Sequence, residues 1–160
     1  LHVRRGSIEL EECAGNVQLE ARDAFARIQD PSGELSLNTV RGDVVVDARE
    51  SADLQSLAAD AMDGSVVAYV SAELAATVRA EAKGGQILTD LPLTLAATPT
   101  GARGSGTVGK RTTPITLMAT AGSVYLYAGT RTARVRVPRV LRLHPDTNAL
   151  QAVPALRPER

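Results

Sequence analysis

Aromatic residues are scarce in this 160-residue chain: they make up 2% of it, with three tyrosines, one phenylalanine and no tryptophan. A sugar-binding groove usually stacks sugar rings on aromatic faces, so the composition disfavours one. It also disfavours a single-stranded nucleic-acid site, where bases stack on aromatic side chains. Since 44% of the chain is still hydrophobic, we expect a narrow interior filled by small and branched aliphatic residues.

Other chemical groups are equally sparse. The single cysteine, Cys13, excludes an internal disulfide, argues against a structural zinc site and is expected to be a small buried hydrophobe. No run of about 18 apolar residues predicts a transmembrane helix. His2 and His144 lie far apart without a Ser or Asp constellation nearby, and no serine occupies a GxSxG elbow. We therefore expect a non-enzymatic protein without a cofactor.

What the chain has instead is a nine-residue repeat. A glycine, or an alanine in its place, occurs at Gly6, Gly15, Ala24, Gly33 and Gly42, and apolar residues follow two and four positions later. Alternation with period two predicts a strand with one buried face, and the glycine suits a tight turn. A short fixed period indicates that one unit is stacked, because such a unit cannot bury its apolar face alone.

After residue 46 the alternation loosens but continues as far as Val137. Residues 54–62 also fit one face of a helix that would stop at Gly64, so a helix is the alternative there. We predict an all-β fold: a β-solenoid, or single-stranded β-helix, with two short strands per coil and neighbouring coils stacked on each other. An antiparallel β-sandwich is the alternative, because strands that recur every 8 to 12 residues, roughly, fit it too.

The predicted repeat domain covers residues 1–143. Beyond it, Pro145, Pro154 and Pro158 punctuate a segment without clear alternation. Residues 144–160 are therefore expected to form a C-terminal tail or a cap on the last open edge.

Residues 104–110 match two phosphate-binding motifs by letter, GxGxxG and most of a P-loop. Both motifs need a helix that begins at the loop. Here Arg111 replaces the Ser or Thr that would reach magnesium, and Pro114 among β-branched residues indicates a strand. We interpret the segment as a glycine-rich connection between two strands and reject nucleotide binding.

Five acidic residues could form a calcium site or the carboxylate cluster of a β-helical carbohydrate enzyme: Asp43, Asp47, Asp60, Asp63 and Asp90. Calcium needs six to eight converging oxygens, roughly, and calcium-binding nonapeptide repeats carry Gly-Gly and Asp in every turn. That pattern is absent from the sequence, and these acids fall at turns or outward positions where solvation explains them. No metal site is predicted.

The zero net charge conceals a segregation of charge along the chain. Residues 1–102 carry 16 acidic and 8 basic side chains, whereas residues 103–160 carry 2 acidic and 10 basic ones. In an elongated stack, this order predicts a separation of charge along the axis and head-to-tail self-association.

An arginine-rich strand is the strongest surface feature, and we predict it as the anion- or partner-binding strip; its members are Arg131, Arg134, Arg136, Arg139 and Arg142. Because Arg134 and Arg136 alternate with Val135 and Val137, a strand would present both guanidinium groups on one face. The alternative is a solvated face, or an edge protected by charge against pairing. As a binding strip, it would take phosphate groups, acidic lipid or an acidic protein surface.

Two stretches resemble a known family. The sequences Gly64-Ser-Val-Val-Ala-Tyr-Val70 and Gly85-Gln-Ile-Leu-Thr89 are similar to the strand rhythm of the bacterial putative-adhesin β-strand-repeat family. Residues 115–126 resemble its closing segment, I-x-L-x-T-x-x-G-x-I-x-L, and the resemblance covers residues 6–127. It implies a β-solenoid domain with a role in adhesion, scaffolding or envelope association, and it supplies no catalytic residue.

The sequence thus predicts a non-enzymatic scaffold or adhesin-like interaction module that self-associates or binds a protein partner. The alternative is a module that binds a polyanion (nucleic acid, acidic lipid or an envelope polymer) through the arginine-rich strand. The chain starts at Leu1 within a strand-like pattern, and we interpret it as a processed or trimmed chain. The bacterial cytoplasm and the cell envelope therefore both stay open as compartments.

Overall fold

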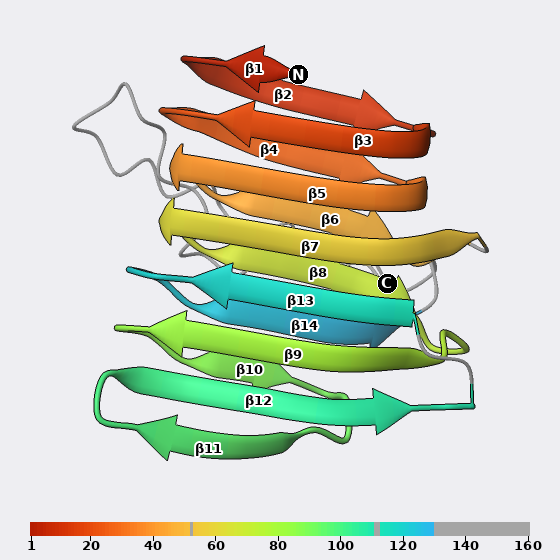
Figure 1. The fold of residues 1–160 in the computed structure, drawn as a ribbon, viewed down its shortest axis with the longest axis vertical. Coiled ribbons are helices and arrows are strands. Elements are labelled where there is room, and N and C mark those ends of the chain that lie inside the picture. Colours follow the sequence, from red (N-terminus) through yellow and green to blue (C-terminus); the bar gives the residue numbers. More distant parts are fainter. Residues whose placement is uncertain (52, 111–112, 130–160) are drawn as a thin grey trace, which may run out of the picture.

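The computed structural model describes residues 1–51, 53–110 and 113–129, and within them it is an all-β solenoid of two facing sheets (Figure 1). The larger sheet contains, in spatial order, β1 (His2–Val3), β3 (Ala14–Ala21), β5 (Ser32–Arg41), β7 (Leu54–Asp63), β13 (Thr113–Ala119), β9 (Ala76–Lys83), β12 (Gly101–Val108) and β11 (Thr94–Thr98). The smaller sheet contains β2 (Gly6–Glu11), β4 (Ala24–Gln29), β6 (Val44–Ala48), β8 (Val66–Ser71), β14 (Val124–Gly129) and β10 (Ile87–Thr89). The solenoid prediction is confirmed.

Each coil contributes one strand to each sheet, so two of the nine-residue units make one coil. Paired residues in the first coils are 18 positions apart, as in Ile8 beside Ala26 and Val17 beside Leu35. The next step, from Val46 to Ala68, is 22 positions long. All these pairings are parallel, as expected for stacked coils that turn the same way.

The core lies between the two sheets and consists of inward rows of aliphatic side chains. One row of the smaller sheet runs through Ile8, Ala26, Val44, Val66, Val124 and Ile87. Facing it, the larger sheet contributes a row through Leu19, Leu37, Ala59, Leu117 and Ala80. Burying a Leu or Val side chain stabilises the fold by about 1.5–3 kcal/mol, so these rows hold the coils together.

The coils are not stacked in sequence order. Strand β13 lies between β7 and β9, and β14 lies between β8 and β10 (Figure 1). The last described coil therefore inserts into the middle of the stack, where Ile115 pairs with both Leu57 and Val78. The order of the coils in the stack therefore departs from their order along the chain.

The distal end of the stack is closed by an antiparallel hairpin. Strand β12 pairs antiparallel with β9 on one side and with β11 on the other. Gly104 and Gly106 leave room that Leu95 and Leu93 occupy, because a Cβ on either glycine would lie 2.8 Å from those leucine side chains. The interpretation of residues 104–108 as a connection is wrong: they are a strand, and its glycines are packing positions.

The ambiguous segment at residues 54–62 forms strand β7 rather than a helix. Leu57, Ala59 and Ala61 point into the core, whereas Ala58 and Met62 are exposed on the outer face. Stacking on β5 and β13 satisfies the backbone of this segment, which a local helix would have satisfied internally.

Candidate interaction surfaces

The arginine-rich strand predicted as a binding strip lies outside the described residues, as does His144. Arg131, Arg134, Arg136, Arg139 and Arg142 therefore remain a sequence prediction, and so does the domain boundary after residue 143. His2 is exposed on β1, with its Nδ1 2.9 Å from the Glu20 carboxylate. Cys13 is half-buried rather than buried, and burial raises the pKa of its thiol despite an opposing backbone hydrogen bond.

The acidic residues singled out in the sequence are dispersed over the stack. Asp60 is half-buried on β7, Asp63 is exposed at its end, and Asp90 accepts a 2.7 Å hydrogen bond from the Ala128 amide. Across residues 1–51, 53–110 and 113–129, no three His, Cys, Asp or Glu side chains come together as a metal site would require.

Asp43 belongs to a series of side-chain to backbone hydrogen bonds between neighbouring coils, at the turns that precede the strands of the smaller sheet. The residue after each corner glycine uses its side-chain oxygen to accept the backbone amide of the next coil: Ser65 N–H donates to Asp43 (2.7 Å), Ser123 N–H to Ser65 Oγ (3.2 Å), and Gln86 N–H to Ser123 Oγ (3.1 Å). Burial raises the pKa of Asp43, and the Ser65 amide only partly offsets that effect. The Gly-Asp and Gly-Ser dipeptides are therefore structural.

The glycines preceding these residues form a column in which each packs on the backbone of its neighbour. A Cβ on Gly64 would lie 2.7 Å from the carbonyl carbon of Gly42, and a Cβ on Gly122 would lie 2.6 Å from that of Gly64. A Cβ on Gly85 would meet the carbonyl carbon of Gly122 at 2.5 Å. Close approach of the corners, more than backbone conformation, thus requires glycine here.

All four aromatic residues of the chain lie outside the core, on the outer face of the smaller sheet. Tyr69 and Tyr125 are buried there with Val45 and Val67, and Phe25 and Tyr127 pack against them. The rings of Tyr69 and Tyr127 are stacked, with centroids 5.9 Å apart. We call these six residues the aromatic face.

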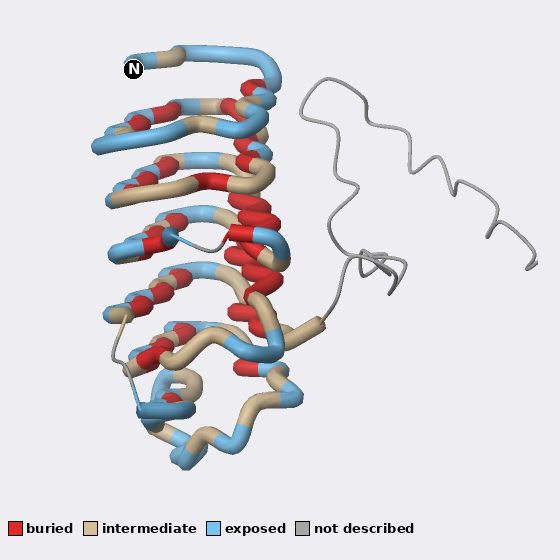
Figure 2. Tube along the Cα trace, turned by 90° about the vertical axis from the view of Figure 1, so that its right-hand side faces the viewer, coloured by how far each residue is buried: buried red, intermediate tan, exposed pale blue. Residues whose placement is uncertain are grey.

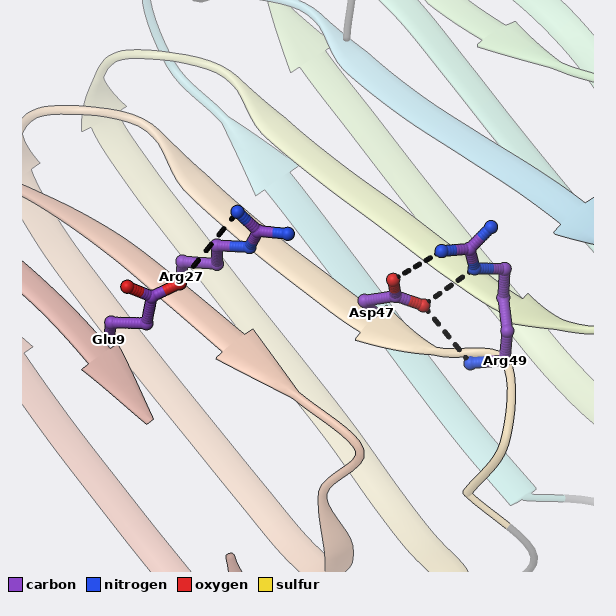
Figure 3. A network of polar contacts seen from close by, with 4 residues as sticks. All are labelled: Glu9, Arg27, Asp47 and Arg49. Carbon is purple, nitrogen blue, oxygen red and sulfur yellow. Dashed lines mark hydrogen bonds and ion pairs between the residues drawn. The ribbon is translucent and has the colours of Figure 1, made fainter. Parts of the chain in front are cut away.

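A buried ion pair adjoins the aromatic face (Figure 3). Arg49 Nε and Nη2 donate to the two carboxylate oxygens of Asp47 at 2.7 and 2.6 Å, and the guanidinium lies 5.4 Å from the centre of the Tyr69 ring. Burial acts to raise the pKa of Asp47, but the hydrogen bonds and charge of Arg49 outweigh it and lower that pKa. On the same face, Arg27 and Glu9 form an exposed ion pair of 3.7 Å.

A cavity of about 1080 Å³ opens at the corner where β6 passes to β7 and β8 passes to β9. Its lining includes Glu50, Asp53 and Glu73 together with Ser71 and Leu74. The pairing partner of Ser71 is Gly129, the last residue of β14. Gly129, the last described residue, therefore lies beside this cavity, which Arg49 lines together with the three acids.

In the part of the chain that the structure describes, no strand lies beyond β1 and β2, so the N-terminal end of the stack is open there. Strand β2 is an edge of the smaller sheet, with β4 as its neighbour, and β1 covers β3 over two residues. Val3, Leu10 and Val17 at this end are half-buried, whereas equivalent residues inside the stack are buried. An open end of this kind exposes unpaired backbone groups and part of the core.

Neither the protein-family models nor the curated proteins contain a match to this chain. Among solved structures, the chain is similar to a putative cell adhesion protein from Clostridium sporogenes, at 9% identity and a TM-score of 0.44, over 80% of this chain and 91% of that one. The similarity is a distant one between folds and says nothing about function. The family resemblance inferred from the sequence is matched at this coarse level alone. The described residues include no helix able to cross a membrane.

Proposed function

We propose that this chain is a non-enzymatic β-solenoid scaffold, adhesin-like in its architecture, that self-associates by strand addition at its open N-terminal end. The observation that carries the proposal is the unpaired edge of β2, with half-buried core residues beneath it. A strand from a second copy would pair this backbone and cover the exposed part of the core.

The direction of the backbone hydrogen bonds identifies which residues would pair. Gly6 and Glu12 N–H groups donate toward β4, to the carbonyls of Asp23 and Gln29. Because alternate residues of a strand point to opposite sides, the N–H of Glu9 faces the open side. Glu9 is therefore a position where the outer edge can be blocked without removing a bond to β4.

The substitution Glu9→Pro tests the proposal, since proline removes that N–H and is tolerated at the open edge of an edge strand. We expect Glu9→Pro to abolish self-association in sedimentation or light-scattering measurements. The matched control Glu9→Gln removes the charge and keeps the N–H, so it should still associate. A protein that stays monomeric at all concentrations, or a Glu9→Pro variant that associates normally, would refute the proposal.

Salt dependence identifies the surface that the open end contacts. Association that weakens steeply with salt indicates that carboxylates of the open end, such as Glu9 and Glu11, meet basic residues of another copy. Association that strengthens with salt indicates that surfaces of like charge meet. Of the ten basic residues at positions 103–160, only Arg103 and Lys110 are among the described residues, so the basic excess belongs mainly to residues 130–160.

A polyanion-binding role is the second candidate. It is favoured by the composition of residues 130–160, which carry seven basic and two acidic side chains. Retention on heparin at low salt, lost when Arg134 and Arg136 are both replaced by alanine, would support this role. A chain that is not retained at low salt would exclude it.

A further inference from the structure

On the outer face of the smaller sheet, one row of outward side chains changes from exposed to buried and back to exposed. In spatial order this row contains Glu9, Arg27, Val45, Val67, Tyr125 and Leu88. The residues at its two ends are exposed, whereas Val45, Val67 and Tyr125 are only 7, 0 and 6% exposed. The burial is thus local to β6, β8 and β14.

The described chain does not supply a layer that accounts for this burial. The two sheets enclose the core between them, and in residues 1–51, 53–110 and 113–129 no strand packs on the outer side of the smaller sheet (Figure 2). An outward position of a two-layer solenoid is ordinarily solvated and polar, as Glu9 and Arg27 are. The aromatic face is therefore built to be covered.

We propose that the C-terminal segment, residues 130–160, docks on the aromatic face of its own chain and covers it. Chain connectivity favours this occupant, because the segment begins directly after Gly129, the last residue of β14, which itself forms part of the face. The three strands concerned are spaced about 4.8 Å apart, so about four extended residues are enough to cross them. The segment has 31 residues.

The composition of the segment fits the surface. In an extended stretch, Val135 and Val137 project to one side and Arg134 and Arg136 to the other, which gives one apolar face for the tyrosines and one charged face for solvent. The segment contains no aromatic residue and no long acidic run. The alternation at residues 133–137 is typical of an edge strand with one apolar side.

Charge complementarity points to the same occupant. Residues 130–160 carry seven basic and two acidic side chains, whereas residues 1–129 carry eleven basic and sixteen acidic ones. The segment starts where Gly129 pairs with Ser71, at the rim of the cavity lined by Glu50, Asp53 and Glu73. Opposite charges at that rim favour keeping the start of the segment close to its own chain, beside β8 and β14.

Tyrosine fluorescence reports on this face alone. The chain has no tryptophan, its three tyrosines all lie on the aromatic face, and residues 130–160 contribute no aromatic signal. In the full chain we expect strong protection of tyrosine fluorescence from acrylamide, unchanged on dilution. Tyrosines quenched as readily as free tyrosine would overturn the proposal. So would protection that disappears on dilution together with a dimer, because a second copy would then be the cover.

Substitutions in the segment test the predicted face. Val135→Ser combined with Val137→Ser should remove the protection, while Arg134→Lys with Arg136→Lys should keep it, since the charged side faces solvent. Far-UV circular dichroism shows whether the solenoid stays folded in each variant. Unchanged protection in a folded double-serine variant contradicts the proposal.

A second measurement needs no destabilising substitution. A protease site inserted between Gly129 and Thr130 of the full chain allows the segment to be cut after folding. A docked segment should co-elute with residues 1–129 and keep the tyrosines protected, and it should dissociate on strong dilution. Immediate separation at low salt with full exposure of the tyrosines would overturn the inference.

Discussion

The substitution Gly122→Ala tests two features at once: the close packing of the turn glycines of neighbouring coils, and the insertion of the coil of β13 and β14 into the stack. A Cβ at this position would lie 2.6 Å from the carbonyl carbon of Gly64 and 3.0 Å from Ser65 Oγ. Both neighbours are held in the stack, so relief requires β14 to move away from β8 at the corner. That movement also strains the 3.2 Å hydrogen bond from the Ser123 amide to Ser65 Oγ.

The expected cost combines two effects. Overpacking against fixed backbone costs about 1–3 kcal/mol, and weakening one hydrogen bond costs about 0.5–1.5 kcal/mol. We therefore expect Gly122→Ala to reduce the free energy of unfolding by about 2–4 kcal/mol, a large part of the stability of a domain of this size. Urea unfolding followed by tyrosine fluorescence measures it, because Tyr69 and Tyr125 lie on the two strands concerned.

Gly6→Ala is the matched control. Gly6 stands at the open end of the same column, and a Cβ there meets nothing within 4 Å. Its φ of 120° still makes alanine unfavourable, so we expect a smaller loss of about 1 kcal/mol. If the two variants were equally stable, contact between neighbouring corners could not be the reason for glycine at position 122.

Three further predictions concern the core, the buried Asp47 and the half-buried Asp43. Leu117→Ala, in the inserted strand β13 and 0% exposed, should cost about 2–5 kcal/mol in urea unfolding, whereas Met118→Ala on the outer side should cost much less; equal losses would contradict the inward assignment. Because the pKa of Asp47 is lowered in the folded chain, this group stabilises the fold above the ordinary carboxyl pKa, and the stabilisation is lost as the pH falls. The variant Asp47→Asn should therefore lose less stability than the wild type when the pH is lowered into the acid range. The pKa of Asp43 is raised, so ionisation opposes folding there: Asp43→Asn, which keeps an acceptor for the Ser65 amide, should stabilise the chain at neutral pH and lose that advantage below the ordinary pKa. Thermal unfolding between acid and neutral pH checks both signs, and a parallel response of the two variants would contradict the reasoning.

The insertion of β13 and β14 has a consequence for folding. Leu57 and Ile115 are neighbours in the larger sheet although 58 positions separate them in the chain. Strands β9, β11 and β12 therefore join the rest of the larger sheet only when β13, which comes later in the sequence, is in place. Pairings of such long range raise the entropic cost of reaching the native state and slow folding.

The burial of Val45 and Val67 on the aromatic face could have been predicted from the sequence. Val44-Val45-Val46 and Val66-Val67-Ala68 are continuous apolar runs rather than alternating ones, and such runs are typical of strands buried on both faces. The alternation around them indicated one buried face and gave no reason to expect two. The low aromatic content correctly predicted an aliphatic interior. It did not indicate that the few aromatic rings gather on the outer face of the smaller sheet.

The predicted fold is confirmed, whereas the predicted functional residues are not tested by the structure. The arginine-rich strand at residues 131–142 lies beyond the described chain, so its role is still a prediction. The structural partner of Asp43 could not be found from the sequence, because Ser65 is 22 residues away and reaches Asp43 only through stacking. The partner of Asp47, Arg49, is only two residues away.

The sequence by itself determined that this protein is built of short strands that turn at glycines and bury one aliphatic face each. Period-two alternation and glycine spacing are local properties, and local sterics translate them directly into strands and corners. Only the tertiary structure decided the order of the coils, the open end at β2 and the clustering of Tyr69, Tyr125 and Tyr127 on one outer face. Coils with similar aliphatic rows can stack on one another in several orders, so the choice depends on contacts between residues far apart in the chain, such as Gly122 fitting between Gly64 and Gly85.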